Sequence, residues 1–421
     1  MRGLLIPDLS VITKSRILVS RLALVHQHRV WTTHLPQIQP YYAVKSNPDP
    51  TLLSWIRAQR TLHVDCASPA EMDLCIKAGF GIDDILYANT MKSGEDLQAA
   101  ADRGIRVTTT DSVEGVEQIA TTSWRPRVIV RIAVDDRGSR SPFSLKFGAT
   151  EDEWLPVMRA IRQYNLPFGG ISFHVGSASS NPEAFGMAIQ RCRAFQKAVN
   201  CDIPLVDIGG GFQPNETLFQ QTARQIQKGM RDWELDSGSP PRQLIAEPGR
   251  FFSAPTQTVL VPIVFKKTSK DRVRYMLDDS VYGQFSGIVY DHAKPFWKVI
   301  RKDGDKDGDK DGDKDGDQRK DKKKAFFFGK TCDSLDLIAI QDNAPDYEVG
   351  DVFAFPWMGA YTSASATEFN GFRYPTKTYI NDTTTSFHPL FNEIERGDPT
   401  ITFPIETHSK VSLSVTDNTN T

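Results

Sequence analysis

The chain has 421 residues, of which 39% are hydrophobic and 24% charged, a composition typical of a globular protein with more than one domain. Its formal net charge of −2 does not favour nucleic acid or a membrane surface, so we expect a small-molecule partner. Five cysteines without paired spacing are typical of free thiols, and the sequence has neither a signal-peptide core nor a membrane-spanning run, which favours a cytoplasmic protein.

Eight short apolar runs occupy the first 250 residues, and each ends at a polar or glycine-rich step. They end at Val44, Ala67, Asn89, Ser112, Val134, Gly176, Gly211 and Gly249. Between them lie segments with apolar residues three and four positions apart, such as 51–60, 69–80, 152–164 and 182–199, which are typical of helices. Eight alternating units predict a (β/α)8 barrel over residues 25–252, whose active site would gather at the C-terminal ends of the strands.

After about residue 253 the apolar runs alternate more with polar residues and no helical segments separate them. This predicts a C-terminal antiparallel β-barrel or sandwich domain over residues 253–421, with residues 1–24 packing against it. The fold class is therefore α/β plus all-β.

Residues 302–324 form an insert in the predicted β-domain, in which Lys-Asp-Gly-Asp repeats four times before a basic tail. It lacks apolar side chains, so we expect disorder. The aspartate spacing resembles the start of an EF-hand calcium loop, but Lys314 stands where that loop needs glutamate. A solvated loop is favoured over a weak calcium site, and we predict no metal.

Several chemically capable residues follow the predicted strands directly. Lys45 ends the first run, and burial there would lower its pKa and free its amine as a nucleophile, although an ordinary surface lysine is the alternative. Glycines 209–211 could form a backbone cradle for a phosphate or simply a flexible turn. Arg250 could bind the same phosphate, unless it only pairs with Glu247.

His174 and Glu247 complete the candidate site. An imidazole at the barrel mouth can stack on a flat aromatic cofactor, although a satisfied core histidine is the alternative. A carboxylate beside a pyridine nitrogen keeps that nitrogen protonated and makes the ring a strong electron acceptor. Racemases of similar architecture have arginine at this position, so Glu247 favours decarboxylation.

These motifs together resemble the eukaryotic ornithine decarboxylases, which belong to the alanine-racemase-like, fold type III enzymes that use pyridoxal 5'-phosphate. The resemblance runs from about Leu5 to about Phe372, interrupted by the insert. It is carried by YYAVKSNPDP, HVDCASPAE, YANTMK, RIAVDD, KFGA, FHVGSAS, DIGGGF, EPGRFF, VYGQFSGIVYDHA, GKTCDSLD and MGAYTSASATEFNGF.

The resemblance implies a role for each matching residue. Lys45 binds the cofactor covalently, His174 stacks on its ring and Glu247 pairs with the ring nitrogen. Asp65 and Arg131 line the cofactor pocket, where structural ion pairs are the alternative. The phosphate shell consists of Ser177, Gly210, Gly211, Arg250 and Tyr361.

The resemblance also implies a head-to-tail homodimer with shared active sites. Cys332 and Asp333 reach the partner's pocket, where Cys332 governs protonation of the substrate carbon after CO2 leaves. Lys146 and Asp336 match positions that pair across the interface. An antizyme-like protein is a further expected partner. One departure is Lys330, where the family usually has proline.

The expected reaction is decarboxylation of L-ornithine to putrescine, a step of polyamine biosynthesis. Asp291, Asp333 and Tyr290 would bind the substrate, because carboxylates attract its distal ammonium group. Related arginine decarboxylases tend to alter the YDHA aspartate, which this chain keeps, and diaminopimelate decarboxylases usually carry a CESGD-like motif in place of TCDSLD. Another basic amino acid, or a catalytically inactive homologue like the antizyme inhibitors, is the alternative.

Overall fold

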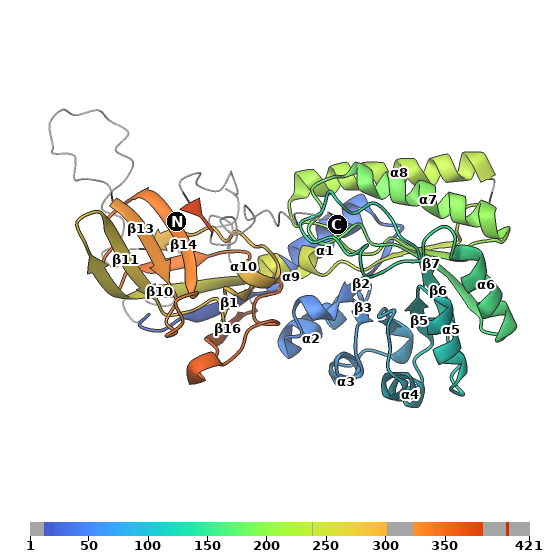
Figure 1. Cartoon of the computed structure of the whole chain (residues 1–421), viewed down its shortest axis with the longest axis horizontal. Coiled ribbons are helices and arrows are strands. Elements are labelled where there is room, and N and C mark those ends of the chain that lie inside the picture. The colour runs from blue at the N-terminus through green and yellow to red at the C-terminus, as the bar shows by residue number, and fades with distance from the viewer. Residues whose placement is uncertain (1–11, 238, 301–322, 382–400, 404–421) are drawn as a thin grey trace, which may run out of the picture. The chain divides into compact units, whose positions relative to one another are not determined.

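The computed structural model describes residues 12–237, 239–300, 323–381 and 401–403. They form two compact units, coloured by residue number in Figure 1. The barrel unit comprises residues 20–256 and 359–364, and the β unit comprises the described residues of 12–19, 257–358 and 365–403. The units therefore meet along the chain at residues 19 and 256, compared with 24 and 252 expected from the sequence. The return of residues 359–364 to the barrel unit was not predicted.

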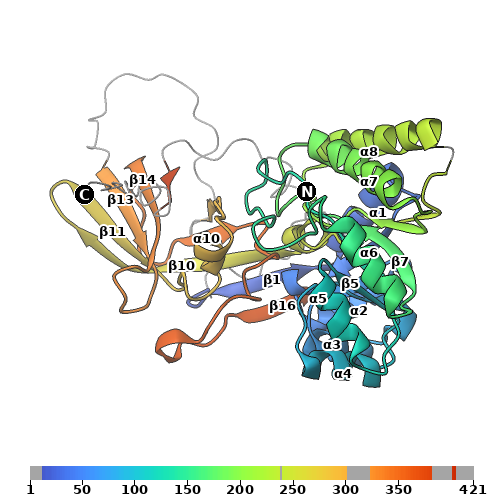
Figure 2. The same cartoon turned by 45° about the vertical axis from the view of Figure 1, so that its right-hand side comes forward.

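The predicted (β/α)8 barrel is confirmed, because eight strands form a closed parallel barrel in chain order from β2 to β9. Helices lie outside the strands in both views (Figures 1 and 2). The strands are β2 (Gln39–Ala43), β3 (His63–Cys66), β4 (Ile85–Tyr87), β5 (Val107–Thr110), β6 (Arg127–Arg131), β7 (Phe168–Ser172), β8 (Leu205–Asp207) and β9 (Gln243–Ala246). The helices are α1 (Arg21–His34), α2 (Pro50–Ala58), α3 (Pro69–Lys77), α4 (Gly94–Asp102), α5 (Val113–Ala120), α6 (Trp154–Gln163), α7 (Glu183–Val199), α8 (Glu216–Ser237) and α9 (Arg250–Ser253).

Short capped turns lead from several barrel strands into the following helices. The side chains of Asp49, Ser68, Ser93 and Ser112 accept hydrogen bonds from backbone N–H groups in the first turns of α2, α3, α4 and α5. Because each connection is short, a polar residue just after a strand is held at the barrel mouth.

The barrel interior is filled by apolar side chains. Leu86, Ile129 and Leu205 come from alternate strands and pack with Ile245 in one buried cluster. Such interlocking layers make the barrel a rigid support for the residues at its mouth.

Lys92 is a buried lysine of the barrel unit, and its ammonium donates to the Thr109 carbonyl at 2.6 Å. Burial lowers the pKa of Lys92 to about 7, which Asp111 offsets only in part. Between that pH and the ordinary lysine pKa of about 10.4, the unfolded chain binds this proton and the folded chain does not. The free energy of unfolding should therefore rise with pH, by up to about 1.4 kcal/mol per pH unit from this group.

Lys92→Met is expected to remove that part of the pH dependence. Urea denaturation of both proteins at several pH values within this window measures it. If the free energy of unfolding changed equally with pH in the variant and in the parent chain, Lys92 would have to stay protonated in the folded state.

The β unit contains one mixed sheet of nine strands, which corrects the expectation of a purely antiparallel domain. β11 pairs in parallel with β13, while β10 pairs antiparallel with β1, β11 and β15, as do β12 with β15, β13 with β14 and β14 with β17. The strands are β1 (Arg16–Ser20), β10 (Gln257–Thr268), β11 (Arg272–Leu277), β12 (Lys298–Ile300), β13 (Lys323–Phe328), β14 (Leu337–Ala344), β15 (Val352–Phe355), β16 (Thr376–Ile380) and β17 (Ile401–Thr402). A short helix, α10 (Ser286–Tyr290), also interrupts the strands, contrary to expectation.

The predicted insert of residues 302–324 lies outside the described residues except for its last two. Lys323 and Lys324 begin strand β13, so the predicted end of the insert is wrong by two residues. Burial alternates along this strand, with Ala325 and Phe327 buried and their neighbours partly exposed, as expected for a β-strand.

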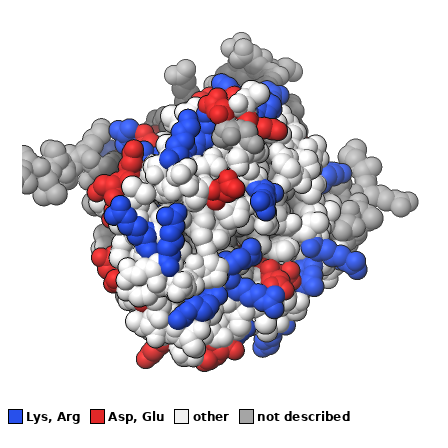
Figure 3. Space-filling view, turned by 90° about the vertical axis from the view of Figure 1, so that its right-hand side faces the viewer, with Lys and Arg blue, Asp and Glu red and all other residues white. Residues whose placement is uncertain are grey.

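The remaining general expectations concern thiols, membranes and charge. All five cysteines are free: Cys66, Cys75, Cys192, Cys201 and Cys332. Among the described residues, no helix combines the length and the apolar character that a membrane span needs. On the face drawn in Figure 3, basic and acidic side chains are interspersed with uncharged surface.

Candidate active site

Lys45 lies at the C-terminal end of β2, in a single 3-10 turn formed by residues 44–46. Its ammonium donates to the Asp65 carboxylate at 3.0 Å, and its side chain is 43% exposed whereas that of Asp65 is fully buried. Burial alone would lower the pKa of Lys45, but the carboxylates of Asp65 and Glu247 outweigh it and raise this pKa. The predicted lowering of the pKa is therefore wrong for this structure, and Asp65 holds Lys45 as a cation.

His174 follows strand β7 at the same end of the barrel. Its Nδ1 accepts a hydrogen bond from the Gly176 N–H at 3.0 Å, and the Phe143 ring packs edge-on with centroids 4.9 Å apart. Burial first, and then the positive charges of Arg131 and Lys45, lower the pKa of His174 well below its usual value. The imidazole is therefore neutral at neutral pH, which suits stacking on a flat ring better than a cation would.

Arg131 ends strand β6, and its guanidinium carbon lies 4.9 Å from the centroid of the Phe147 ring. Burial lowers its pKa, and the nearby Glu247, Asp111, Asp207 and Asp65 raise it in part. Arginine stays charged through such a shift, so Arg131 contributes a permanent positive charge to the barrel mouth.

Three carboxylates face these cations. Burial raises the pKa of Asp207 to about 7, and burial together with the charges of Asp207 and Asp65 raises the pKa of Glu247 well above its usual value. Asp65 Oδ1 is buried without a hydrogen-bond partner among the described residues. The three carboxylates therefore offer more hydrogen-bond acceptors and negative charge than the described residues satisfy. A protonated nitrogen of a bound aromatic ring would supply a donor and a positive charge there.

Asp207 is a site residue that the sequence analysis missed. It ends strand β8, and its Oδ1 accepts the Gly209 N–H at 2.9 Å. The available signal was its place in VDIGGGF, two positions before the first of the three glycines.

The glycines of β8's C-terminal loop leave no room for side chains. A Cβ on Gly210 would lie 2.8 Å from both His174 Nε2 and the Glu247 carbonyl oxygen. Gly211 has φ of +99°, and a Cβ there would lie 2.6 Å from the Gly176 carbonyl oxygen. Glycine at both positions therefore lets this loop pack directly against His174, Gly176 and the Glu247 backbone.

The other predicted phosphate residues lie together in the barrel unit. The Nη2 atom of the Arg250 guanidinium donates a hydrogen bond to Ser177 Oγ at 3.0 Å. The Arg250 guanidinium carbon lies 4.8 Å from the centroid of the Tyr361 ring. Two hydroxyl groups and a guanidinium near a glycine-lined turn are donors that suit a phosphate.

The predicted substrate residues lie in the β unit. Cys332 is exposed, and its N–H donates to Asn370 Oδ1 at 3.2 Å. The Tyr282 hydroxyl donates to Asp333, and Asp333 is the main cause of a raised Tyr282 pKa, to which Tyr290 also contributes. Tyr290 and Asp333 therefore both lie near Tyr282, while Asp291, at the C-cap of α10, is buried.

Asp336 makes several hydrogen bonds within its own chain. Its buried carboxylate accepts hydrogen bonds from the N–H groups of Val281 and Thr331, at 2.9 and 3.0 Å, and from the Thr331 hydroxyl at 2.7 Å. These contacts within the chain organise the loop that carries Cys332. Lys146, its expected partner across an interface, places its ammonium 5.0 Å from the Phe147 ring centroid.

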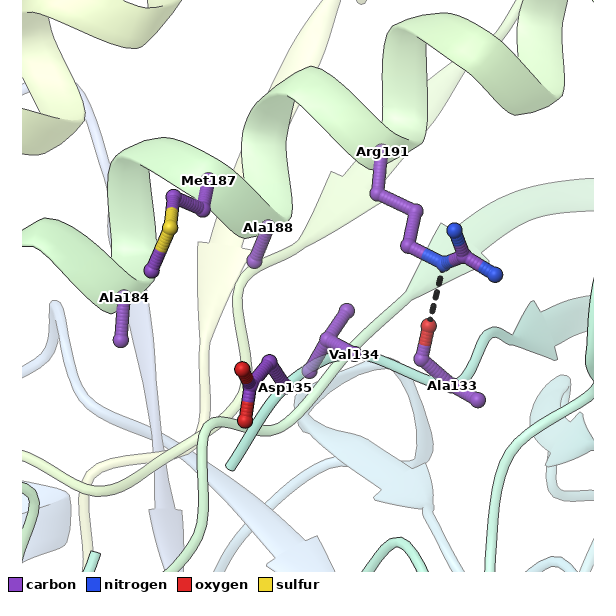
Figure 4. Close-up of a pocket in the computed structure, with 7 residues that line it drawn as sticks. All are labelled: Ala133, Val134, Asp135, Ala184, Met187, Ala188 and Arg191. Carbon is purple, nitrogen blue, oxygen red and sulfur yellow. Dashed lines mark hydrogen bonds between the residues drawn. The ribbon is translucent and has the colours of Figure 1, made fainter. Parts of the chain in front are cut away.

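A separate cavity of about 350 Å³ lies in the barrel unit between α7 and the segment after β6 (Figure 4). Arg191 borders it and donates to the Ala133 carbonyl oxygen at 2.8 Å. None of the predicted site residues lines this cavity.

Comparison with known proteins places this site in a family. The pyridoxal-binding domain of the pyridoxal-dependent decarboxylases matches residues 21–254, more than half of the chain. The chain belongs to that family. This confirms the resemblance found in the sequence, and the matched region contains every predicted cofactor residue except Tyr361.

Relatives extend the similarity to both units of this decarboxylase. An ornithine decarboxylase of Schizosaccharomyces pombe is 36% identical over 359 residues, which cover 83% of this chain and 80% of that protein. A Paramecium bursaria Chlorella virus arginine decarboxylase, solved with agmatine, is 30% identical with a TM-score of 0.77, covering 87% of this chain and 97% of that one. A Vibrio vulnificus lysine/ornithine decarboxylase, solved with cadaverine, is 27% identical with a TM-score of 0.75, covering 89% and 96%.

Proposed function

We propose that this decarboxylase converts L-ornithine to putrescine and CO2, using pyridoxal 5'-phosphate bound at Lys45. The observation that carries the proposal is the meeting of an amine, a neutral imidazole and a buried carboxylate at one barrel mouth, beside donors suited to phosphate. When bound, pyridoxal phosphate supplies a carbonyl carbon for amines and a pyridine ring that accepts electrons. Ornithine is favoured because several relatives that match most of this chain are ornithine decarboxylases.

Each barrel residue then has a defined task. Lys45 would hold the cofactor covalently, and Asp65 would orient the Lys45 amine. His174 would lie against the ring, Glu247 would keep a proton at the ring nitrogen, and Arg131 would balance the carboxylates. Ser177, Gly210, Gly211, Arg250 and Tyr361 would hold the phosphate.

Recognition of the substrate is assigned to the β unit. Asp291 and Asp333, together with Tyr290, would bind the distal ammonium of ornithine, and Cys332 would supply a proton to the carbon that loses CO2. Charge-assisted hydrogen bonds to that ammonium would disfavour substrates with neutral side chains. The structures of arginine and lysine decarboxylases among the relatives make those amino acids, and then diaminopimelate, the alternative substrates.

Substrate choice is tested by measuring kcat/KM for L-ornithine, L-arginine and L-lysine with the parent chain and with Asp291→Asn. We expect ornithine to be the best substrate and the variant to raise its KM by about tenfold or more, as for loss of one charged partner. A preference for arginine or lysine in the parent chain would keep the cofactor chemistry and contradict the choice of ornithine.

We further propose that the enzyme is a homodimer with shared active sites. Leu335, in the loop that carries Cys332 and Asp333, is 72% exposed, and Tyr290, at the end of α10, is 69% exposed. Large exposed side chains beside proposed substrate residues support an interface there. Cys332 and Asp333 of one protomer would complete the barrel site of its partner. The five free thiols support a cytoplasmic location.

Shared sites predict that two inactive variants restore activity when mixed. Lys45→Ala damages the barrel part of a site and Cys332→Ala the β part, so a mixed dimer keeps one intact site, for about a quarter of normal activity if subunits exchange freely. Lys45→Ala mixed with His174→Ala is the control, because both lesions lie in the barrel part of the site. Equal recovery in both mixtures, or none in either, would argue against sharing.

The rival proposal is an inactive homologue that binds a regulatory protein such as an antizyme. It is disfavoured because Lys45, His174, Glu247 and Arg250 are all present with the contacts that catalysis needs. An antizyme-like regulator that binds the active enzyme remains part of the proposal.

A further inference from the structure

Asn47 lies two residues after Lys45 and is 2% exposed. Its side-chain amide donates to the Gly359 carbonyl oxygen at 2.8 Å, across 312 positions of sequence, while its Oδ1 accepts the Asp49 N–H at 3.2 Å. Residues 44–47, which we call the Lys45 turn, are thus joined to residues 359–364, which we call the return segment. Both belong to the barrel unit.

The return segment is held tightly against the Lys45 turn. The Tyr361 N–H donates to the Ser46 carbonyl oxygen at 2.9 Å, and the Gly359 N–H donates to the Ala254 carbonyl oxygen at 3.0 Å. A Cβ on Gly359 would lie 1.9 Å from the Ser253 carbonyl oxygen, so only glycine permits this approach. The segment therefore depends on a few specific contacts rather than on a helix or strand of its own.

Tyr361 needs this support because its backbone is in the left-handed region, with φ of +55°. A non-glycine residue keeps such a conformation only when its surroundings enforce it. In this position its ring faces the Arg250 guanidinium at 4.8 Å, and Arg250 in turn contacts Ser177. The same short turn thus carries Lys45 and fixes the residue beside Arg250.

We propose that Asn47 is a positioning residue for the cofactor phosphate. By holding the Gly359 carbonyl, it keeps the return segment in the conformation that places Tyr361 beside Arg250. The inference rests on the proposed function, because it takes Tyr361 and Arg250 as the phosphate site. Asn47 itself is not expected to touch the cofactor.

The experiment compares two ligands of the cofactor-free, full-length enzyme: pyridoxal 5'-phosphate and pyridoxal, which lacks the phosphate. Asn47→Asp keeps the acceptor for Asp49 but replaces the donor to Gly359 with a second acceptor. We expect it to weaken pyridoxal phosphate binding by about tenfold or more, the effect of an unpaired buried polar group, and pyridoxal binding by less than about twofold. Absorbance titration measures both dissociation constants.

Asn89→Asp is the matched control. Asn89 follows strand β4 in a similar loop, where its amide donates to the Ala67 carbonyl at 3.3 Å and its Oδ1 accepts the Met91 N–H at 3.1 Å. It makes the same pair of bonds without contacting the return segment, so neither dissociation constant should change by more than about twofold. Asn47→Ala removes the donor without adding charge and gives the same contrast if Asn47→Asp does not fold.

Tyr361→Phe separates failure of this inference from failure of the proposed function. If the inference and the proposed function both hold, Tyr361→Phe weakens binding of pyridoxal phosphate more than binding of pyridoxal. The double variant Asn47→Asp, Tyr361→Phe then binds pyridoxal phosphate less weakly than the product of the two single effects predicts. Selective weakening by Tyr361→Phe but not by either Asn47 variant would overturn this inference alone. Equal weakening of both ligands by both Asn47 variants would overturn it too. No selective effect of Tyr361→Phe would remove Tyr361 from the phosphate site and overturn both.

Discussion

Lys45→Ala is expected to lose the visible absorbance of the bound cofactor and to lower kcat by on the order of 10³-fold or more, because no other amine of the site takes its place. Lys45 lies at the barrel mouth, and its ammonium lies 3.0 Å from a fully buried carboxylate. Absorbance of the purified variant after incubation with pyridoxal phosphate, together with CO2 release from L-ornithine, measures both effects.

Lys92→Met provides the control for this variant. Lys92 is buried in the barrel unit, and this burial lowers its pKa to about 7. If a lowered pKa alone selected the cofactor lysine, Lys92 would be the better candidate. We expect Lys92→Met to keep the absorbance and the activity, so the opposite pattern would contradict the assignment of Lys45.

Glu247→Gln is expected to retain the cofactor on Lys45 but to lower kcat by about 10²- to 10³-fold, the size of effect seen when one preorganised electrostatic partner is removed. The glutamine has the same shape but no charge to hold a proton at the ring nitrogen. The carboxylate matters because it is buried beside Asp207 and Asp65, which raise its pKa together with burial. Steady-state kinetics and the absorbance spectrum of the variant separate the two effects.

Glu151→Gln is the control for Glu247→Gln, because it removes the same charge from an exposed glutamate. Glu151 is more than half exposed and pairs with Arg191 at 3.7 Å, so its loss should leave kcat unchanged. A Glu247→Gln enzyme with normal kcat would mean that the ring nitrogen needs no carboxylate, and the choice of decarboxylation over racemisation would lose its physical basis.

The barrel, and the positions of most candidate cofactor residues at its mouth, could be predicted because their signals are local. Each strand shows as a short apolar run that ends in a turn, and Lys45, His174 and Glu247 follow such runs directly. The closed order of the strands then brings these residues to one mouth, because parallel strands of a barrel end on the same side.

Features that depend on contacts between residues far apart in the sequence could not be predicted from local patterns. The pKa of Lys45 rises because Asp65, 20 positions away, lies within hydrogen-bonding distance, and the apolar pattern of the run before Lys45 predicts only burial. Likewise, nothing local indicates that β11 pairs in parallel with β13 or that Gly359 returns to the barrel unit. The buried contacts of Asp336 with Val281 and Thr331 join segments about 50 positions apart and also leave no local pattern.

The central claim is that this chain decarboxylates ornithine with pyridoxal phosphate at the barrel site. The most direct test measures release of labelled CO2 from L-[1-13C]ornithine by the purified full-length chain, with and without added pyridoxal phosphate, and identifies the amine product. The account predicts equal amounts of labelled CO2 and putrescine, dependent on the cofactor and abolished in Lys45→Ala. Absence of labelled CO2 from a folded chain that has bound the cofactor would contradict it.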